Sequence, residues 1–228
     1  MKLFILKAIV ALVLIAGIAA QAGIDYRYAG TGYVIPDGNL SGVYSQIAVS
    51  GANSSLSDIS VTINVSGGYN GDLYAYLSYD GKLVPLLNRI GVSSGNIFSS
   101  SGAGMNVTLS DASGFNGNIH AAGAGVLSGT WQPDGQAISP LSSALSFSST
   151  GGSVTLDGAF QNINPNGEWT LFFADVSAGG GQATLDGWSL NITTVPEPVN
   201  LALACFAAMF LLVTKARILF QTHPPKAD

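Results

Sequence analysis

The sequence predicts an all-β fold, a jelly-roll-type antiparallel β-sandwich, with an apolar helix at each end of the chain. Three observations predict it. Several segments of the body alternate apolar and polar residues, clusters of Gly, Asp and Ser separate these segments, and none of them has the 3.6-residue period of a helix. Of the 228 residues, about 170 remain for this body once both apolar ends are set aside.

The N-terminal end has the organisation of a secretory signal peptide. Lys2 and Lys7 are followed by an apolar run at 8–20, and then by the small-x-small sequence Ala20-Gln21-Ala22. A basic start, an apolar run and such a site are typical of signal peptides, so we expect cleavage after Ala22 and export. The alternative is an uncleaved signal anchor.

Four segments of the body have the clearest strand patterns. Residues 58–66 and 73–77 each place their apolar side chains on one face, and Asp80-Gly81 then predicts a hairpin turn before 82–87. Near the end of the body, 169–173 and 188–192 show the same alternation and are predicted to pair with each other. The residues expected to face the core are Ile59, Val61, Ile63, Val65, Leu73, Ala75, Leu77, Trp169, Leu171, Phe173, Trp188, Leu190 and Ile192.

The middle of the body, 91–159, is predicted to consist of short strands and long loops. Its patterned pieces are MNVTLSD, LSFSS and GSVTLDG, which lie between stretches rich in glycine and serine. Nothing in the body repeats at a fixed period, which argues against a propeller or a solenoid.

Charge and cysteine content exclude several classes of protein. Residues 23–194 hold eleven acidic and three basic side chains, so three minus eleven gives a net charge of −8, which disfavours binding to nucleic acid. The single cysteine, Cys205, lies in the C-terminal apolar run. The body therefore has neither a disulfide nor a thiolate metal site.

Two parts of the body resemble the P domain (Homo B domain) of proprotein convertases and their bacterial relatives. The matching features are Ile35-Pro36-Asp37, Gly71-Asp72-Leu73, the run from Asn166 to Leu171, and Trp188-Ser189-Leu190. The resemblance implies a jelly-roll sandwich that supports an attached subtilisin-like protease domain. Only twelve residues separate Ala22 from Ile35, so we expect no catalytic domain between them.

The C-terminal end resembles the PEP-CTERM sorting signal of Gram-negative bacteria. Val195-Pro196-Glu197-Pro198 precedes an uncharged run at 199–214, and Lys215 and Arg217 follow. The resemblance implies recognition by an exosortase in the inner membrane and cleavage near the motif. The prolines favour an extended, accessible segment, and the bases after the run predict a cytoplasmic C-terminus. A plain single-span anchor is the alternative.

We expect no enzymatic activity. The chain has two histidines, and His223 lies beyond the apolar run, so His120 alone could serve a serine triad. The sequence around Ser93, GVSSG, fits a nucleophile elbow, but it lacks the strand and helix that such an elbow needs. No catalytic residue is therefore assigned.

Two binding sites are considered. The resemblance to P domains allows calcium to bind through Asp37, Asp72 or Asp175, although ordinary turn aspartates explain the same residues. Aromatic rings could stack on a carbohydrate, although tyrosines on strands more often pack against neighbouring strands. The candidate aromatic residues are Tyr69, Tyr74, Tyr76 and Trp131.

Together these features predict a signal peptide at 1–22, a P-domain-like sandwich at 23–194, a sorting signal with a transmembrane helix at 195–220, and a cytoplasmic tail at 221–228. We expect an exported, non-catalytic protein, anchored in the inner membrane before processing and then located at the cell surface or in the extracellular matrix. An exosortase is the predicted partner, with exopolysaccharide or a separate protease as further candidates. Two alternative functions remain: an accessory of a subtilisin-like protease, and a carbohydrate-binding module.

Overall fold

The computed structural model describes residues 24–52, 54–112, 116–195, 203 and 205–214. The chain divides into two units, of which one is Asp25–Thr194 and the other consists of the two ends of the chain. The signal-peptide residues Ala20 and Ala22 lie outside the described residues.

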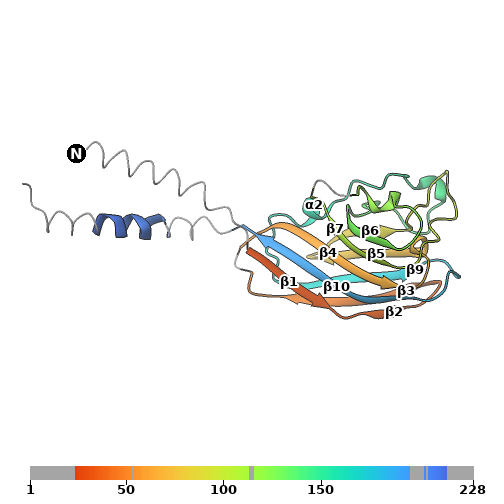
Figure 1. Ribbon diagram of the computed structural model, residues 1–228, viewed down its shortest axis with the longest axis horizontal. Helices are drawn as coiled ribbons and strands as arrows, with labels where there is room; N and C mark the ends of the chain where they lie inside the picture. The colour runs from red at the N-terminus through yellow and green to blue at the C-terminus, as the bar shows by residue number, and fades with distance from the viewer. Residues whose placement is uncertain (1–23, 53, 113–115, 196–202, 204, 215–228) are drawn as a thin grey trace, which may run out of the picture. The chain divides into compact units, whose positions relative to one another are not determined.

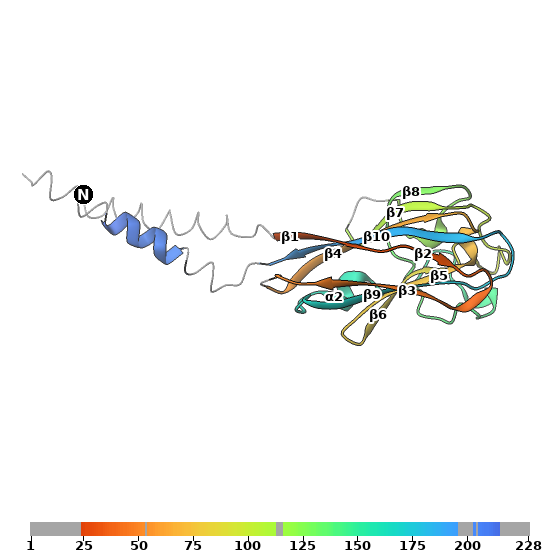
Figure 2. The same ribbon diagram turned by 90° about the horizontal axis from the view of Figure 1, so that it is seen from below.

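The larger unit is built from two β-sheets, which form the two layers of a sandwich (Figures 1 and 2). The first sheet has the order β1-β10-β4-β7-β8, with β2 also paired to β10, and the second has the order β3-β9-β5-β6. The strands of the first sheet are β1 (Ile24–Gly30), β2 (Tyr33–Ile35), β4 (Leu56–Ser66), β7 (Met105–Ser110), β8 (Leu127–Trp131) and β10 (Ala183–Thr194). Those of the second are β3 (Asn39–Val49), β5 (Leu73–Tyr79), β6 (Lys82–Asn88) and β9 (Gly167–Asp175).

The mostly β character predicted from the sequence is confirmed, with one departure from antiparallel pairing. Strand β10 pairs antiparallel with β2 and β4, β4 does so with β7, and the three pairings of the second sheet are antiparallel. Strands β7 and β8 instead run parallel, with Met105 opposite Leu127. The long connection between them, which contains the 3₁₀ helix η2 (Ile119–Ala121), makes this parallel pairing possible.

The core lies between the two sheets and has the period-two pattern that the sequence predicted. In β4, Ile59, Val61 and Ile63 are fully buried and alternate with partly exposed polar residues. All thirteen residues expected to face the core are buried. Each large aliphatic side chain buried in this way contributes about 1.5–3 kcal/mol, which is the main stabilisation available to a domain without disulfides.

The prediction that the two tryptophan-containing strands pair with each other is wrong. Strand β9 pairs with β3 and β5, whereas β10 lies in the other sheet. Trp169 and Trp188 therefore enter the core from opposite layers. Alternation identifies the buried face of a strand but not its neighbours, because strands on both sides of a core bury the same kind of face.

The hairpin predicted at Asp80-Gly81 is confirmed. Both residues have positive φ, 50° and 71°, and Tyr79 pairs with Lys82 across the turn. Two central residues with positive φ are typical of the tight turns whose twist matches that of the flanking strands.

The middle of the body is less regular than the strand patterns suggested. MNVTLSD contains β7 as expected, but LSFSS begins within the 3₁₀ helix η3 (Ala144–Ser146) and GSVTLDG leads into the short helix α2 (Leu156–Phe160). The helix begins where the Thr155 hydroxyl accepts a hydrogen bond from the Gly158 N–H at 3.0 Å. This local cap outweighs the weak alternation of the segment.

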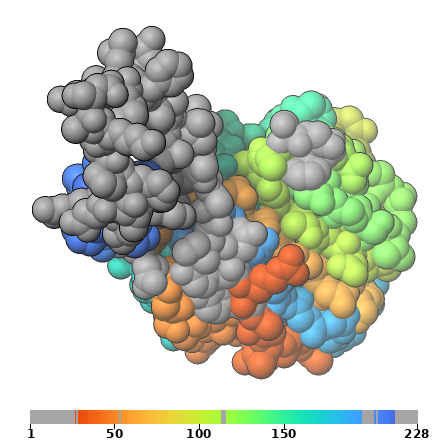
Figure 3. All heavy atoms as spheres, turned by 60° about the vertical axis from the view of Figure 1, so that its left-hand side comes forward, coloured from red at the N-terminus to blue at the C-terminus, as the bar shows by residue number. Residues whose placement is uncertain are grey.

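Both ends of the larger unit lie at the same end of the sandwich (Figure 1). On the molecular surface, the red-orange N-terminal strands lie beside the blue last strand, although the two are far apart in the sequence (Figure 3). In the smaller unit, residues 203 and 205–214 are described as helical. Within the described part of the chain, no helix reaches the length and apolar character needed to span a membrane.

Candidate functional site

The single histidine of the sandwich is fully buried and bonded at both ring nitrogens. Nδ1 of His120 lies 2.7 Å from Oδ2 of Asp134, and Nε2 lies 2.8 Å from the carbonyl oxygen of Val92. The ring of Phe147 stacks on the imidazole with centroids 6.1 Å apart. Through these contacts, the His120–Asp134 pair holds η2, the turn after β6 and the loop at 132–136 together.

The two groups of this pair compensate each other electrostatically. Burial lowers the pKa of His120, but the hydrogen bond and charge of Asp134 and the Val92 carbonyl outweigh it, so the net pKa lies above 6.5. Oδ2 of Asp134 also accepts a hydrogen bond from the Asn88 N–H, and Oδ1 accepts one from the Gln136 N–H. Every polar atom of the imidazole and the carboxylate therefore has a partner.

Ser93, the serine of the elbow-like sequence, makes no hydrogen bond to His120. Ser93 N–H donates to the Asn96 carbonyl, and Asn96 N–H donates back, so the segment forms a tight turn rather than a strand-to-helix elbow. The partner of Nε2 of His120 is instead the backbone carbonyl of Val92, one residue before Ser93.

The three aspartates considered for calcium gather near one end of the sandwich. Asp72 ends the 3₁₀ helix η1 (Asn70–Asp72), Asp175 ends β9, and Asp37 lies in the turn before β3. Asp175 pairs with Leu73 in the adjacent strand, which places it beside Asp72. Asp37 is exposed, and its carboxylate accepts a hydrogen bond from the Gly179 N–H at 3.2 Å.

Asp72 and Asp175 are buried like charges with incomplete hydrogen bonding. Burial, followed by the negative charge of Asp175, raises the pKa of Asp72 to about 6, although Arg89 acts in the opposite direction. Burial likewise raises the pKa of Asp175, although the N–H groups of Ser177 and Gly38 act in the opposite direction. Oδ1 of Asp175 accepts the Ser177 N–H at 3.1 Å, but the buried Oδ2 has no partner.

The fit of these residues to calcium is partial. Among the described residues, no group of three or more His, Cys, Asp or Glu side chains is arranged to hold a metal. Calcium also accepts backbone carbonyl and water oxygens, so two carboxylates can suffice as its charged ligands. The unpartnered Oδ2 of Asp175 is the atom that such an ion would satisfy.

A second acidic cluster was missed by sequence reasoning. Oδ2 of Asp111, which follows β7, accepts the backbone N–H of Asp157 at 2.6 Å. Burial, then the charges of Asp111 and Asp58, raise the pKa of Asp157 to about 6. These residues lie 46 or more positions apart in the sequence, so only the packing of α2 against β4 shows that they meet.

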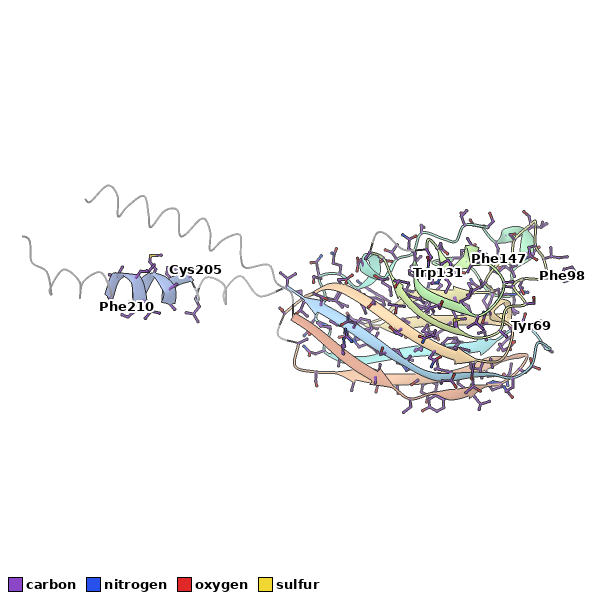
Figure 4. The ribbon with its side chains drawn as sticks, viewed as in Figure 1. Tyr69, Phe98, Trp131, Phe147, Cys205 and Phe210 are labelled. Atoms are coloured by element: carbon purple, nitrogen blue, oxygen red, sulfur yellow. The ribbon has the colours of Figure 1, made fainter. Side chains whose placement is uncertain are left out.

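The four candidate aromatic residues do not form one surface. Tyr74 and Tyr76 are neighbours on the outer face of β5, with ring centroids 5.9 Å apart. Tyr69 lies toward one end of the sandwich, and Trp131 ends β8 in the other sheet, where its Nε1–H donates to the Ser128 carbonyl (Figure 4). Sequence reasoning missed Phe172, which stacks on Tyr76 at 4.9 Å.

Of the predicted sorting motif, the structure describes only Val195, which is 46 % exposed and follows the last residue of β10. Pro196, Glu197 and Pro198 lie outside the described residues.

Comparison with known proteins identifies no family. No protein-family model matches the chain, and no curated protein matches it. Among solved structures, the chain is similar to the crystal structure of the Aeromonas sobria serine protease (ASP) and chaperone (ORF2) complex, with 13 % identity and a TM-score of 0.41. The match covers 81 % of this chain but 29 % of that one.

Proposed function

We propose that this protein is an exported, non-catalytic binding or structural protein, which an exosortase sorts through its C-terminal tail to the cell surface or the extracellular matrix. The observation that carries the proposal is the position of the last strand. Strand β10 ends at Thr194, and the Val195-Pro196-Glu197-Pro198 motif begins at the next residue. Cleavage near the motif would therefore release a sandwich that has lost none of its strands.

The state of His120 supports a non-catalytic role. A general base must have a nitrogen free to take a proton from a nucleophile, and both nitrogens of His120 are engaged with Asp134 and Val92. For the imidazole to bind a substrate, its buried ion pair with Asp134 would have to break. We therefore assign the histidine to folding.

The strand order supports a jelly-roll assignment. Strands β2-β10-β4-β7 and β3-β9-β5-β6 make two facing sets of four, and the chain passes between the sheets at most of its connections. An eight-stranded double sheet of this kind is a jelly roll. The first sheet has two further strands, β1, which pairs with β10 as β2 does, and β8 at the opposite edge.

We also propose that calcium binds at the end of the second sheet, with Asp72 and Asp175 as its carboxylate ligands. The partnerless Oδ2 of Asp175 and the raised pKa of Asp72 support this assignment. A divalent cation would neutralise two buried like charges. Asp37 would act by holding the neighbouring loop through Gly179.

Intact mass spectrometry of the protein from membrane and surface fractions tests the sorting proposal. We expect a surface form that ends near Pro198, and we expect Pro196→Ala combined with Pro198→Ala to retain the full-length form in the membrane. The matched control is Pro224→Ala with Pro225→Ala, which also removes two prolines of the C-terminal segment but leaves the motif intact.

A solely full-length membrane form of the wild-type protein would contradict sorting and favour the plain anchor. Stable co-purification of a subtilisin-like protease with the sandwich would instead favour the protease-accessory role that the sequence resemblance implies.

A further inference from the structure

The outer face of the second sheet carries one row of residues that crosses all four strands. Tyr44 of β3 pairs with Phe172 of β9, Phe172 pairs with Tyr76 of β5, and Tyr76 pairs with Pro85 of β6. We call Tyr44, Phe172 and Tyr76 the aromatic row; Pro85, which continues the register on β6, is buried. Two strand spacings separate its ends, a length of about 10 Å. The second sheet, which carries the row, is the lower layer in Figure 2.

The rings near the centre of the row contact each other. Tyr76 and Phe172 stack at 4.9 Å with an interplanar angle of 19°, and Tyr74 contacts both, at 5.9 Å and 6.4 Å. Tyr44 at the edge of the sheet is 64 % exposed. Rings that pack against each other on a rigid sheet lose little freedom when a ligand binds.

The tyrosines of the row differ from the structural tyrosine of the same strand. Tyr79 stacks on the buried Trp169 at 4.1 Å, and its hydroxyl donates to the backbone carbonyls of Asn164 and Asn166. No described residue makes a hydrogen bond to the hydroxyls of Tyr44 and Tyr76. The hydroxyl of Tyr79 therefore has a role in the fold, whereas no such role is seen for the hydroxyls of Tyr44 and Tyr76.

A row of polar side chains runs beside the aromatic row. Gln46 pairs with Thr170, and Thr170 pairs with Ser78, so three neutral polar residues lie one step along the same face. Nε2 of Gln46 donates to Oε1 of Glu168 at 2.6 Å and to Oγ1 of Thr170 at 3.3 Å. Hydrogen-bonding groups thus border the apolar rings.

The charge of this face selects against anionic ligands. Its ionised group is Glu168, and the three bases of the sandwich are placed or engaged elsewhere. Arg27 lies in β1 of the other sheet, Lys82 donates to the Ala159 carbonyl at 2.6 Å, and Arg89 donates to the Pro140 carbonyl at 3.4 Å. A polyanion would meet a carboxylate here without a compensating cation.

We propose that the aromatic row, with Tyr74 and the adjacent polar row, binds a neutral polysaccharide. Sugar rings have apolar faces and hydroxyl-bearing edges, which match a line of aromatic rings bordered by amide and hydroxyl groups. A stable protein interface buries about 800 Å² on each partner around an apolar centre, whereas this row is one residue wide. The inference rests on the proposed role of an exported binding protein and names its ligand class.

Affinity electrophoresis of the full-length protein in a neutral detergent tests the proposal. The gels contain hydroxyethyl cellulose, yeast mannan or dextran as neutral probes, or alginate as an acidic probe. We expect retardation by at least one neutral polysaccharide and none by alginate, with little dependence on salt. Tyr44→Ala and Tyr76→Ala should each weaken binding about fivefold to tenfold.

The matched control is Phe98→Ala, which removes an aromatic ring that is 87 % exposed but lies outside the row. It should leave the affinity unchanged. Unchanged circular dichroism of the tyrosine variants would separate a lost contact from a lost fold.

Three results would overturn the proposal: no retardation by any of the neutral probes, equal retardation of wild type and both tyrosine variants, or a dimer in sedimentation that Tyr44→Ala dissociates. The last would show that a second copy occupies the face. These results concern the sandwich alone, so they are independent of whether the tail is cleaved.

Discussion

Among the side chains that the structure describes, two aspartates are fully buried, Asp134 and Asp175, and they are in opposite electrostatic states. Asp134 faces the imidazole of His120 and accepts two backbone N–H groups, so both of its oxygens are satisfied. Asp175 faces another carboxylate, Asp72, and keeps one oxygen without a partner. The difference separates a carboxylate that contributes to folding from one that is suited to binding a cation.

The largest expected effect is on the compensated pair. His120→Ala should lower the free energy of unfolding by about 3–5 kcal/mol, because it leaves the buried Asp134 carboxylate unpaired. Urea denaturation followed by circular dichroism measures this. His120→Leu combined with Asp134→Leu should cost less than either single change, and a larger loss in the double variant would contradict the pairing.

The pH dependence of that loss sharpens the test. Since the pKa of His120 is higher in the folded than in the unfolded protein, its contribution is complete below 6.5 and is lost as the pH rises through the higher folded-state value. The cost of His120→Ala should therefore be greater at pH 6 than at alkaline pH.

The next largest effect is expected at the pair of like charges, Asp72 and Asp175. Adding calcium to chelator-treated protein should raise the melting temperature, and Asp175→Asn should abolish this response. Without calcium, the same variant should be more stable than wild type at neutral pH by about 1–3 kcal/mol, because it removes a buried like charge. Differential scanning fluorimetry measures both, and magnesium serves as the ion control. A calcium response that survives in Asp175→Asn would place the ion elsewhere.

The smallest effect is a gradual dependence on pH in the presence of a chelator. The pKa values of Asp72 and Asp157 rise from 3.8 to about 6 on folding, so the folded state binds more protons between these values. Stability should therefore fall as the pH rises through this window, by on the order of 1–2 kcal/mol for each group. Asp157→Asn should remove part of this decline without changing the calcium response. A wild-type stability that rises with pH over this range would contradict the raised pKa values of both aspartates.

The sequence predicted the buried faces of the strands because alternation follows directly from which side of a sheet meets the core. It could not predict which strands are neighbours. Ile59 and Trp188 were assigned correctly to the core, yet β10 was paired with β9 instead of β4, because many partners can satisfy the same alternation. The same limit hid Tyr44 and Phe172, which join Tyr76 only through strand register.

The candidate calcium residues were found through resemblance to a family, not through spacing. Asp72 and Asp175 are 103 positions apart, and β9 must lie beside β5 before they meet. The role of His120 was also invisible in the sequence, since a lone histidine gives no indication of its partner. Only the fold shows that the loop carrying Asp134 lies against this histidine.

The place of β10 in its sheet has a consequence for biogenesis. This strand is the last to be synthesised, yet it lies between β1 and β4, and so the first sheet cannot be completed until residue 194 is available. In the export that we propose, the first sheet of the body would therefore close only after its final segment has crossed the membrane. Assembly of the domain would then coincide with delivery of the tail to the membrane, which gives a processing enzyme a finished product to release.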